Sequence, residues 1–475
     1  MVQKPWFGLI CLAIDVWESL INLPRPTFQQ NSDRGVKKKM NKPKEYSWMT
    51  KDKLMTYTFV ALLILAFTSF ISFGIESLVV TAIAVLVAVG LDLLLHKVAA
   101  DSPLDVMSAA VFGLIVALSY TLGKPVMASM DVVPLKTPEA YAIVALVSAT
   151  GLVLFKKIQG LAGRKYVNPA AAAKLLILLP FLGSYFAAKD HLVTGPLQVP
   201  SLAGPIGFEV INNNGAYSFA GYLQACFGPE ISPVTDLSNV YQIMLLQKYH
   251  GWVGGVSSIA VIIVGVALFV VCRRYIKWRI TAAFLATIAL VAFAMSLIYG
   301  GDPVLRLAFH LFIGSSIFLA FFMATDPATT PLTRMGQLLF GVGLGILTLL
   351  IQVYVGVFGG SIIALVIMNL TSPFLDKVGM LKPSMEKKEP KLPKAIQQTE
   401  VKVYACMRCG ACLGVCCHKL SPIMIKEAFD KNNVEAVSKL KADYCTGCGH
   451  CSFVCPARID LKGSVLRAKA KLLSQ

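Results

Sequence analysis

Residues 252–299 read WVGGVSSIAVIIVGVALFVVCRRYIKWRITAAFLATIALVAFAMSLIY, and this stretch decides the fold class. It contains two apolar runs, 252–272 and 280–299, on either side of a short basic segment. That segment contains Arg273, Arg274, Lys277 and Arg279. A helix needs roughly 20 apolar residues to cross about 30 Å of hydrocarbon. We therefore predict two transmembrane helices joined by a positively charged loop.

Eight more apolar runs of similar length bring the number of predicted membrane spans to ten. The expected spans are 54–74, 78–96, 104–122, 140–156, 170–188, 252–272, 280–299, 305–325, 335–355 and 358–375. The composition agrees, because the chain is 56% hydrophobic and only 15% charged, whereas soluble domains are about 25% charged. We therefore predict an all-α membrane protein whose membrane domain occupies residues 51–377.

The chain has a net charge of +18, which raises the question of a nucleic-acid partner. The basic residues instead concentrate in every second loop between the spans, as the positive-inside rule requires of cytoplasmic loops. These loops contain Lys97, Lys156, Lys157, Arg164, Lys165, Arg273, Arg274, Lys277, Arg279, Arg334, Lys377 and Lys382. We therefore expect contact with membrane lipid and no nucleic-acid partner. The expected location is the inner (plasma) membrane, with multiple spans and both termini in the cytoplasm.

Ten spans form two sets of five, and an odd number of helices in each set would invert the second set relative to the first. Asn168-Pro169 opens the fifth span, and Asn369 and Pro373 lie near the end of the tenth. We therefore expect two inverted five-helix repeats. Between them, residues 189–250 are rich in Gly-Pro and Asn-Gly turn signals, which predict a structured extracytoplasmic loop.

The segments outside the spans have distinct compositions. Residues 1–50 are interpreted as a cytoplasmic N-terminal segment with an interfacial amphipathic helix at 5–23 and a basic stretch, and a cleaved signal peptide is the alternative. Residues 378–400 are rich in Lys and Pro and predict a charged linker. His96 and His310 are expected near opposite faces of the membrane, which argues against a haem held between them.

Nine of the twelve cysteines lie between Cys406 and Cys455. They include two runs with the spacing C-x2-C-x2-C-x3-C, the spacing of bacterial ferredoxins, in which the fourth cysteine of each run ligates the other cluster. One predicted [4Fe–4S] cluster is therefore held by Cys406, Cys409, Cys412 and Cys455. The other is held by Cys445, Cys448, Cys451 and Cys416. Residues 401–475 are thus expected to form a small two-cluster ferredoxin-like domain.

Two alternatives to this cysteine assignment remain. Paired C-x2-C motifs also bind structural zinc, although zinc needs only four ligands per site. Cys417 follows the first run where proline is usual, so it is either a spare thiol or a competitor of Cys416 as ligand.

Two carboxylates near the expected inner membrane face are candidates for an ion path, because ionisable groups at membrane depth are often functional. Asp92 lies near the end of the second span, and Asp326 lies at the end of the eighth. For Asp92 the alternative is an interfacial ion pair with a neighbouring lysine.

Several segments resemble the RnfD/NqrB family, the flavin-bearing membrane subunits of the Rnf and Na⁺-translocating NADH:quinone oxidoreductase complexes. They are YVNPAAAAKLLILLPF from Tyr166, HLFIGSSIFLAFFMATDPATTPLTRMGQLLFG from His310 and MNLTSPFLD from Met368. The resemblance covers about residues 50–380 and implies a ten-helix fold. The runs CMRCGACLGVC and CTGCGHCSFVCP are similar to the ferredoxin region of the RnfC subunit, so the chain looks like a fusion.

The resemblance also implies two flavins. In the family, a threonine of the loop between the fifth and sixth spans carries FMN through a phosphoester bond. The segment ISPVTDL, residues 231–237, places Thr235 at the matching position, with Val234 where alanine is usual. The alternative is an ordinary turn threonine, since Asp236 beside it favours a turn. A second, non-covalent flavin, often riboflavin, is expected inside the bundle.

The expected function follows from the motifs and the resemblance together. We expect an electron-transfer subunit of an ion-translocating oxidoreductase complex, which passes electrons from cytoplasmic [4Fe–4S] clusters to membrane-associated flavin and is coupled to Na⁺ or H⁺. The expected partners are other Rnf/Nqr-type subunits and a ferredoxin or an NAD(P)H-linked donor. The alternatives are a redox-gated channel or transporter for small solutes, and a membrane anchor for an iron–sulfur relay to a quinone-reducing partner.

Overall fold

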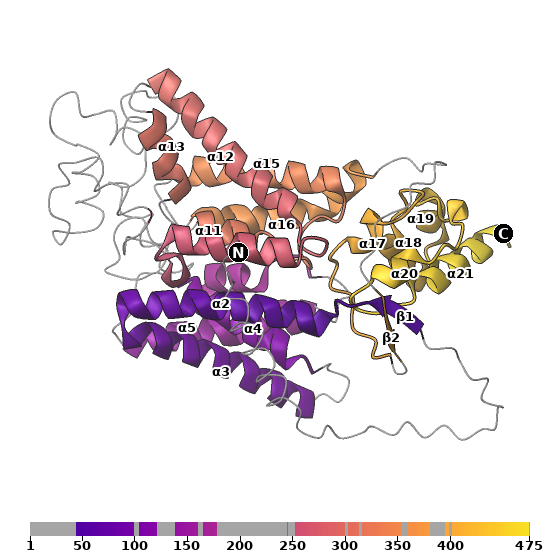
Figure 1. Cartoon of the computed structure of the whole chain (residues 1–475), viewed down its shortest axis with the longest axis horizontal. Coiled ribbons are helices and arrows are strands. Elements are labelled where there is room, and N and C mark those ends of the chain that lie inside the picture. Colours follow the sequence, from indigo (N-terminus) through magenta and orange to yellow (C-terminus); the bar gives the residue numbers. More distant parts are fainter. Residues whose placement is uncertain are drawn as a thin grey trace, which may run out of the picture. The chain divides into compact units, whose positions relative to one another are not determined.

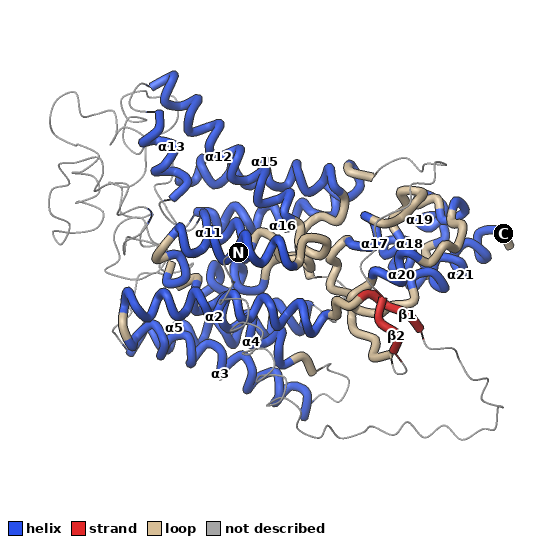
Figure 2. The backbone as a smooth tube through the Cα atoms, viewed as in Figure 1, coloured by secondary structure: helices blue, strands red, loops and turns tan. Residues whose placement is uncertain are grey.

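The computed structural model describes residues 44–98, 104–120, 138–159, 165–177, 245, 252–299, 303–312, 316–352, 360–380, 395–398 and 401–474. They belong to one compact unit, Lys44–Gln475, and most of them are helical (Figure 2).

The first half of the membrane domain contains four long helical segments. They are α2 (Lys51–Phe73), α3 (Ile75–Val98), α4 (Val106–Leu118) and α5 (Pro138–Thr150), and α5 continues as the π-helix η1 (Gly151–Ile158). Residues 169–177 are also helical. Neighbouring residues determine where α2 begins and ends. The Thr50 side chain accepts a hydrogen bond from the Lys53 amide at the start of α2, and Gly74, with a φ of 76°, ends it.

The second half begins with η4 (Val253–Gly255) and α11 (Ser258–Val271), followed by α12 (Trp278–Tyr299). In the region of the expected eighth span, 305–325, the described helical segments are α13 (Pro303–Phe312) and α14 (Ser316–Phe318), which continues directly as the π-helix η5 (Leu319–Met323). Then come α15 (Arg334–Leu350) and α16 (Gly360–Val378).

Five described helices are long and apolar enough to cross a membrane: Lys51–Ile71, Ile75–Val98, Ala140–Ile158, Trp278–Leu297 and Gly360–Val378. Three shorter apolar helices are Val106–Leu118, Ser258–Val271 and Arg334–Leu350. These eight segments correspond to eight of the ten expected spans, and the count of ten stays a prediction. Large apolar side chains such as Leu86 and Leu290 are about 70% exposed, as expected of helices that face lipid.

Some contacts between helices are similar in the two halves. In the first half, α3 contacts α4 and α5, and α2 contacts α4. In the second half, α12 contacts α13 and α15, and α11 contacts α14. The helix α11 also contacts α2, which joins the two halves (Figure 1).

Glycines allow close approach at these helix contacts. A Cβ atom on Gly113 of α4 would lie 2.7 Å from the Val85 Cα atom of α3. A Cβ atom on Gly341 of α15 would lie 2.7 Å from the Ile280 carbonyl oxygen of α12. Both neighbours are backbone atoms, which cannot rotate away. Small residues at such positions are typical of membrane helix pairs.

We call residues 401–474 the C-terminal module. It contains α17 (Ala411–Gly414), α18 (Pro422–Asp430), α19 (Val434–Lys439), η7 (Ala442–Tyr444), α20 (His450–Val454) and α21 (Leu461–Leu473). In front of it, β2 (Ala395–Gln398) pairs antiparallel with β1 (Lys44–Ser47), with Lys44 opposite Gln398. This small sheet joins residues before the first span to residues after the last (Figure 1). Part of the segment expected to be a linker, 378–400, is therefore a strand.

Candidate functional site

The first four-cysteine site surrounds a small cavity in the C-terminal module. Its cysteines are Cys406, Cys409, Cys412 and Cys455, and apolar side chains complete the lining. Three of the cysteines come from the loop that ends in α17, and the fourth follows α20. The turn is possible because Gly410, with a φ of 76°, adopts the left-handed conformation in front of α17.

The second four-cysteine site takes one cysteine from the first run and three from the second, the reverse of the first site. Its cavity is lined by Cys416 from the first run and by Cys445, Cys448 and Cys451 from the second. The quartets are thus the two that the crossed ferredoxin pattern predicts from the sequence. Before α20, Gly449 has a φ of 82°, matching Gly410 in the other run.

The backbones of the two loops repeat one another in detail. The amide of Arg408 lies 3.3 Å from the Cys406 Sγ atom, and the amide of Gly447 lies 3.4 Å from the Cys445 Sγ atom. Arg408 and Gly447 both have positive φ angles, 54° and 72°. An N–H group aimed at each sulfur favours a thiolate there, which is the form that binds metal.

The chemistry of the sulfur donors tests whether a metal centre fits. Burial raises the pKa of Cys409 and of Cys451 to about 12. A thiolate at these positions is therefore unfavourable without a bound cation. Four sulfur donors around a small, largely apolar cavity suit a thiolate-bound metal centre. The residues present fit a [4Fe–4S] cluster in each site.

Cys417, the extra thiol, lies beside the second site. Its Sγ atom is 3.7 Å from His450 Nδ1, and ligand atoms of Cys417, Cys448 and His450 lie within 4.8 Å of one another. Cys417 is not among the residues that line the second cavity. Because Cys417 lies close to the ligand Cys448 but outside the cavity lining, both interpretations, a spare thiol and a competing ligand, stay predictions.

The membrane bundle contains a cavity of about 150 Å³ at the end that meets the C-terminal module. Ends of α2, α4, η1, α11 and η5 contribute to its wall. Its aromatic lining residues are Phe112, Tyr275, Phe321 and Phe322, and its polar ones include Ser108, Lys156, Lys165, Asn168, Thr325 and Asp326. Met407 of the C-terminal module completes the wall, and the same side chain also lines the first four-cysteine site.

Asn168 and Asp326 shape this end of the bundle. The Asn168 side-chain oxygen accepts hydrogen bonds from the amides of Ala170 and Ala171, so it caps the helix that Pro169 begins. Its amide group donates to the Met323 carbonyl at 3.3 Å. Asp326 accepts hydrogen bonds from the Ala328 amide and from a nearby threonine hydroxyl, which closes the turn after η5.

Asp92, the other candidate for an ion path, is buried and forms an ion pair with Lys157. Its second oxygen accepts a hydrogen bond of 3.1 Å from the Asp105 amide. The alternative expected for Asp92 is an interfacial ion pair with a neighbouring lysine, and the partner in the structure is instead Lys157 of η1. Thr235, the candidate for flavin attachment, lies outside the described residues.

Polar contacts bind the C-terminal module to the bundle at two places. At the first, Arg408 lies 3.9 Å from Asp376 of α16 and forms a second ion pair with Glu427. At the second, the Tyr404 hydroxyl donates to Asp52 of α2 at 2.6 Å. The Lys51 amide donates to the Pro456 carbonyl at 3.1 Å. The module is therefore fixed to the bundle through side chains and backbone.

Sequence reasoning missed these contact residues. Asp376 is 1% exposed, and its carboxylate accepts hydrogen bonds from the amides of Leu332 and Thr333 at 2.6 and 3.2 Å. Arg408 stands between two predicted cluster ligands, where a buried charge requires a partner. The sequence could therefore have predicted that Arg408 needs an acidic partner, but it does not identify Asp376 as that partner.

Comparison with known proteins agrees with the architecture of the bundle. Residues 40–383 match the model of the NQR2, RnfD, RnfE family, and residues 384–475, which include the C-terminal module, lie outside that match.

Three relatives are each 27% identical to the chain. The D subunit of the Na⁺-translocating ferredoxin:NAD⁺ oxidoreductase complex of Acetobacterium woodii aligns over 64% of this chain and 81% of its own length. The D subunit of the proton-translocating ferredoxin:NAD⁺ oxidoreductase complex of Clostridium ljungdahlii aligns over 68% and 89%. The D subunit of the ion-translocating oxidoreductase complex of Salmonella typhimurium aligns over 70% and 94%. The chain belongs to the NQR2, RnfD, RnfE family.

Proposed function

We propose that this chain is an electron-transfer subunit of a membrane-bound, ion-translocating oxidoreductase complex of the Rnf type. It passes electrons between [4Fe–4S] clusters in its C-terminal module and flavin associated with its membrane bundle, and the transfer is coupled to Na⁺ or H⁺. The membership of residues 40–383 in the family supports the membrane part of this proposal. The spacing of the eight cysteines supports the iron–sulfur part.

One observation carries the proposal. Met407 lines both the first four-cysteine site and the bundle cavity. A metal centre in the first site and an aromatic cofactor at the bundle cavity would thus be separated by little more than one side chain. A channel that is gated from a distance by a redox sensor would not require one residue to line both sites.

The cysteines have specific roles in this proposal. Cys406, Cys409, Cys412 and Cys455 hold one cluster, and Cys416, Cys445, Cys448 and Cys451 hold the other. Such clusters, when bound, supply one-electron chemistry, and flavins supply both one-electron and two-electron chemistry. Apolar side chains form part of the lining of each cysteine quartet, and one cysteine of each quartet, Cys406 or Cys448, is exposed.

The flavin positions are also part of the proposal. Thr235 carries covalent FMN in the loop 189–250, as the family resemblance implies. A non-covalent flavin, with riboflavin as the candidate, lies inside the bundle, and its ring borders the bundle cavity. There Phe112, Phe321 and Phe322 offer apolar walls for an aromatic ring, and polar groups such as Asn168 lie at the cavity edge.

The proposed topology completes this assignment. Both termini are cytoplasmic, the protein lies in the inner membrane, and two inverted five-helix repeats form the bundle. The similar contacts of α3 with α4 and α5 and of α12 with α13 and α15 support the repeats. The basic side chains Lys156, Lys165 and Lys277 lie near the end of the bundle that meets the module, which supports a cytoplasmic position for that end.

Cofactor analysis of the full chain, purified without oxygen, tests the proposal. We expect about eight iron and about eight acid-labile sulfide per chain, as two [4Fe–4S] clusters require, together with flavin. Zinc in place of iron and sulfide would reject the cluster assignment. Iron and sulfide without any flavin would favour an anchor for an iron–sulfur relay.

A further inference from the structure

The two four-cysteine sites differ in their surroundings, and this difference indicates the order in which electrons pass through them. The inference rests on the proposed function, because it concerns the order of the two sites in electron transfer. Three independent features separate the sites: their distance from the bundle cavity, the packing around them, and the charge of the surface beside them.

The first site lies against the bundle. Met407 is buried within the bundle core, and a Cβ atom on Gly410 would lie 3.4 Å from the Leu332 carbonyl oxygen. Leu332, which belongs to the segment between η5 and α15, packs in one apolar cluster with Cys412 and Cys455. The Arg408–Asp376 contact holds this same loop to α16. The loop of the first site is therefore part of the contact between module and bundle.

The second site packs within the module. The apolar cluster next to it contains Leu420, Ile425, Val437 and Val465, all from the module, with Cys416 and Cys445 against it. Each site has one exposed cysteine, Cys448 in this site and Cys406 in the first. None of the residues that line the second cavity belongs to the described helices of the bundle.

The surface beside the second site is basic with an apolar centre. Lys462 of α21 lines the second cavity, and Lys469 donates a hydrogen bond of 3.0 Å to the Cys445 carbonyl. Between them on the same face of the helix, Leu466 is exposed and lies 3.5 Å from a Cβ atom placed on Gly447. We call Lys462, Leu466 and Lys469 the α21 patch.

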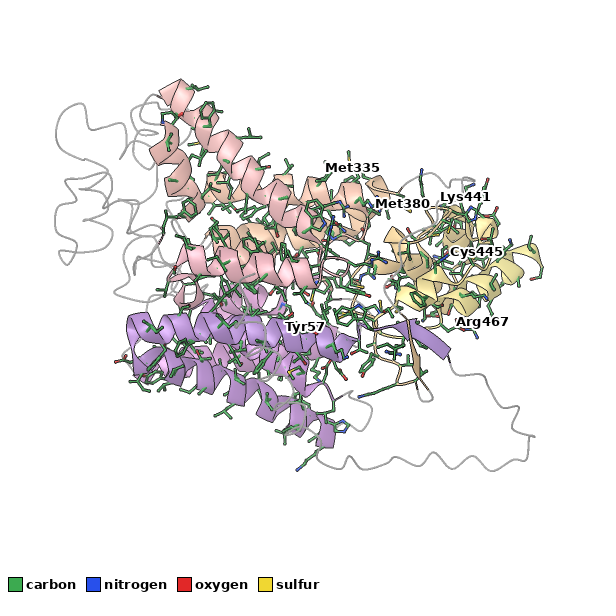
Figure 3. All side chains as sticks on the ribbon, in the orientation of Figure 1. Tyr57, Met335, Met380, Lys441, Cys445 and Arg467 are labelled. Carbon is green, nitrogen blue, oxygen red and sulfur yellow. The ribbon has the colours of Figure 1, made fainter. Side chains whose placement is uncertain are left out.

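The wider surroundings carry a net positive charge, with Asp443 and Asp460, the N-cap of α21, as exposed acidic residues among them. Arg467 and Lys441 are exposed nearby, and Figure 3 shows both with Cys445 in the C-terminal module. Residues 401–475 contain twelve Lys and Arg against five Asp and Glu, and Asp443 is the single acidic residue between 438 and 459. An apolar centre with a rim of one charge is the usual form of a transient docking surface for a partner of opposite charge.

We propose that the second four-cysteine site faces the electron donor and that the first faces the bundle, with the α21 patch as the docking surface for an acidic electron-carrier protein. The carrier brings one electron, its oxidised form leaves, and the electron is accepted at the second site before it reaches the first. The donor binds through charge attraction to Lys462 and Lys469 and through contact with Leu466.

Binding measurements test the docking surface without relying on turnover. The probe is an oxidised, acidic bacterial ferredoxin, and its affinity for the full chain in nanodiscs is measured at low and high salt. We expect the double variant Lys462→Glu and Lys469→Glu to weaken binding by about ten-fold at low salt, and by much less at high salt, because salt screens exposed charges. Lys402→Glu, a like charge change on an exposed lysine beside Tyr404, is the matched control and should leave the affinity unchanged. Equal weakening by both variants would reject the patch.

Electron paramagnetic resonance tests the order of the sites. In the reduced full chain, a soluble dysprosium chelate should enhance the relaxation of the signal from the second site and affect the first site less. Cys448→Ser and Cys409→Ser assign the two signals, because each perturbs one site. Stronger enhancement at the first site, or equal enhancement at both, would overturn the order. Absence of both signals together with absence of iron would instead reject the proposed function.

Discussion

The contact between Asp376 and Arg408 allows a quantitative prediction about docking of the module. In the Asp376→Asn variant the side chain keeps its shape, and its oxygen can still accept the hydrogen bonds from Leu332 and Thr333. It loses the charge that faces Arg408 at 3.9 Å. Two unit charges at that distance attract by about 4 kcal/mol at an effective dielectric constant of about 20.

The expected loss is smaller than this attraction. Arg408 keeps its ion pair with Glu427, so its charge is not left alone in the variant. We therefore expect docking of the module to weaken by about 2 kcal/mol, below the 3–5 kcal/mol that follow when a buried charge loses its only partner. A change of about 2 kcal/mol corresponds to roughly a 30-fold shift in the equilibrium between docked and undocked module.

The Lys51 amide reports on this equilibrium. It stands in the first turn of α2, where amides have no partner within the helix, and it donates instead to the Pro456 carbonyl of the module at 3.1 Å. Hydrogen exchange, read by mass spectrometry on the peptide that contains Lys51, should therefore become roughly 30-fold faster in Asp376→Asn.

A control separates docking from general charge effects. Asp430→Asn removes a carboxylate from an exposed pair with Lys426 in the same module, and such pairs contribute little. It should leave exchange at Lys51 unchanged. Unchanged exchange in Asp376→Asn, with iron content equal to that of the parent chain, would refute the view that the two contact places act together.

Three further predictions concern cofactors and packing. Cys448→Ser should lower iron to about half of the parent value, because one of two clusters loses a ligand; a full complement of iron would contradict the assignment. Thr235→Ala should abolish flavin fluorescence that survives a denaturing gel, whereas Ser232→Ala, the control in the same loop, should keep it. Gly341→Ala should lower the free energy of unfolding by about 1–3 kcal/mol, since its Cβ atom would meet a backbone oxygen at 2.7 Å. Gly90→Ala, with no atom within 4 Å of the new methyl group, should not lower the melting temperature.

The eighth expected span shows where sequence reasoning reaches its limit. Apolar length predicted a helix over 305–325, but it did not predict that residues 319–323 of this region form the π-helix η5. Hydrophobicity is a sum over a window and is insensitive to where backbone hydrogen bonds change register. The π-helical turn of η5 packs Phe321 against Gly265 of α11, and a Cβ atom on that glycine would lie 2.4 Å from the ring. A contact between two distant segments therefore accompanies the change.

The sequence by itself determined the features that depend on local spacing and composition. The interval between cysteines predicted the two quartets that line the two cavities, because a short loop can wrap only one small site and the fourth ligand must come from elsewhere. Apolar runs predicted the helices that face lipid. Asn168 before Pro169 marked a helix start, since capping needs only neighbouring residues.

Only the tertiary structure decided which distant residues meet. It placed Met407 between the first four-cysteine site and the bundle cavity. It also brought Arg408 to Asp376, and paired β1 with β2 across the whole membrane domain. These contacts join segments separated by tens to hundreds of residues, and their formation depends on how the helices pack together. No local pattern of residue types encodes that packing. The order of the two four-cysteine sites relative to the bundle can therefore be inferred only from the folded chain.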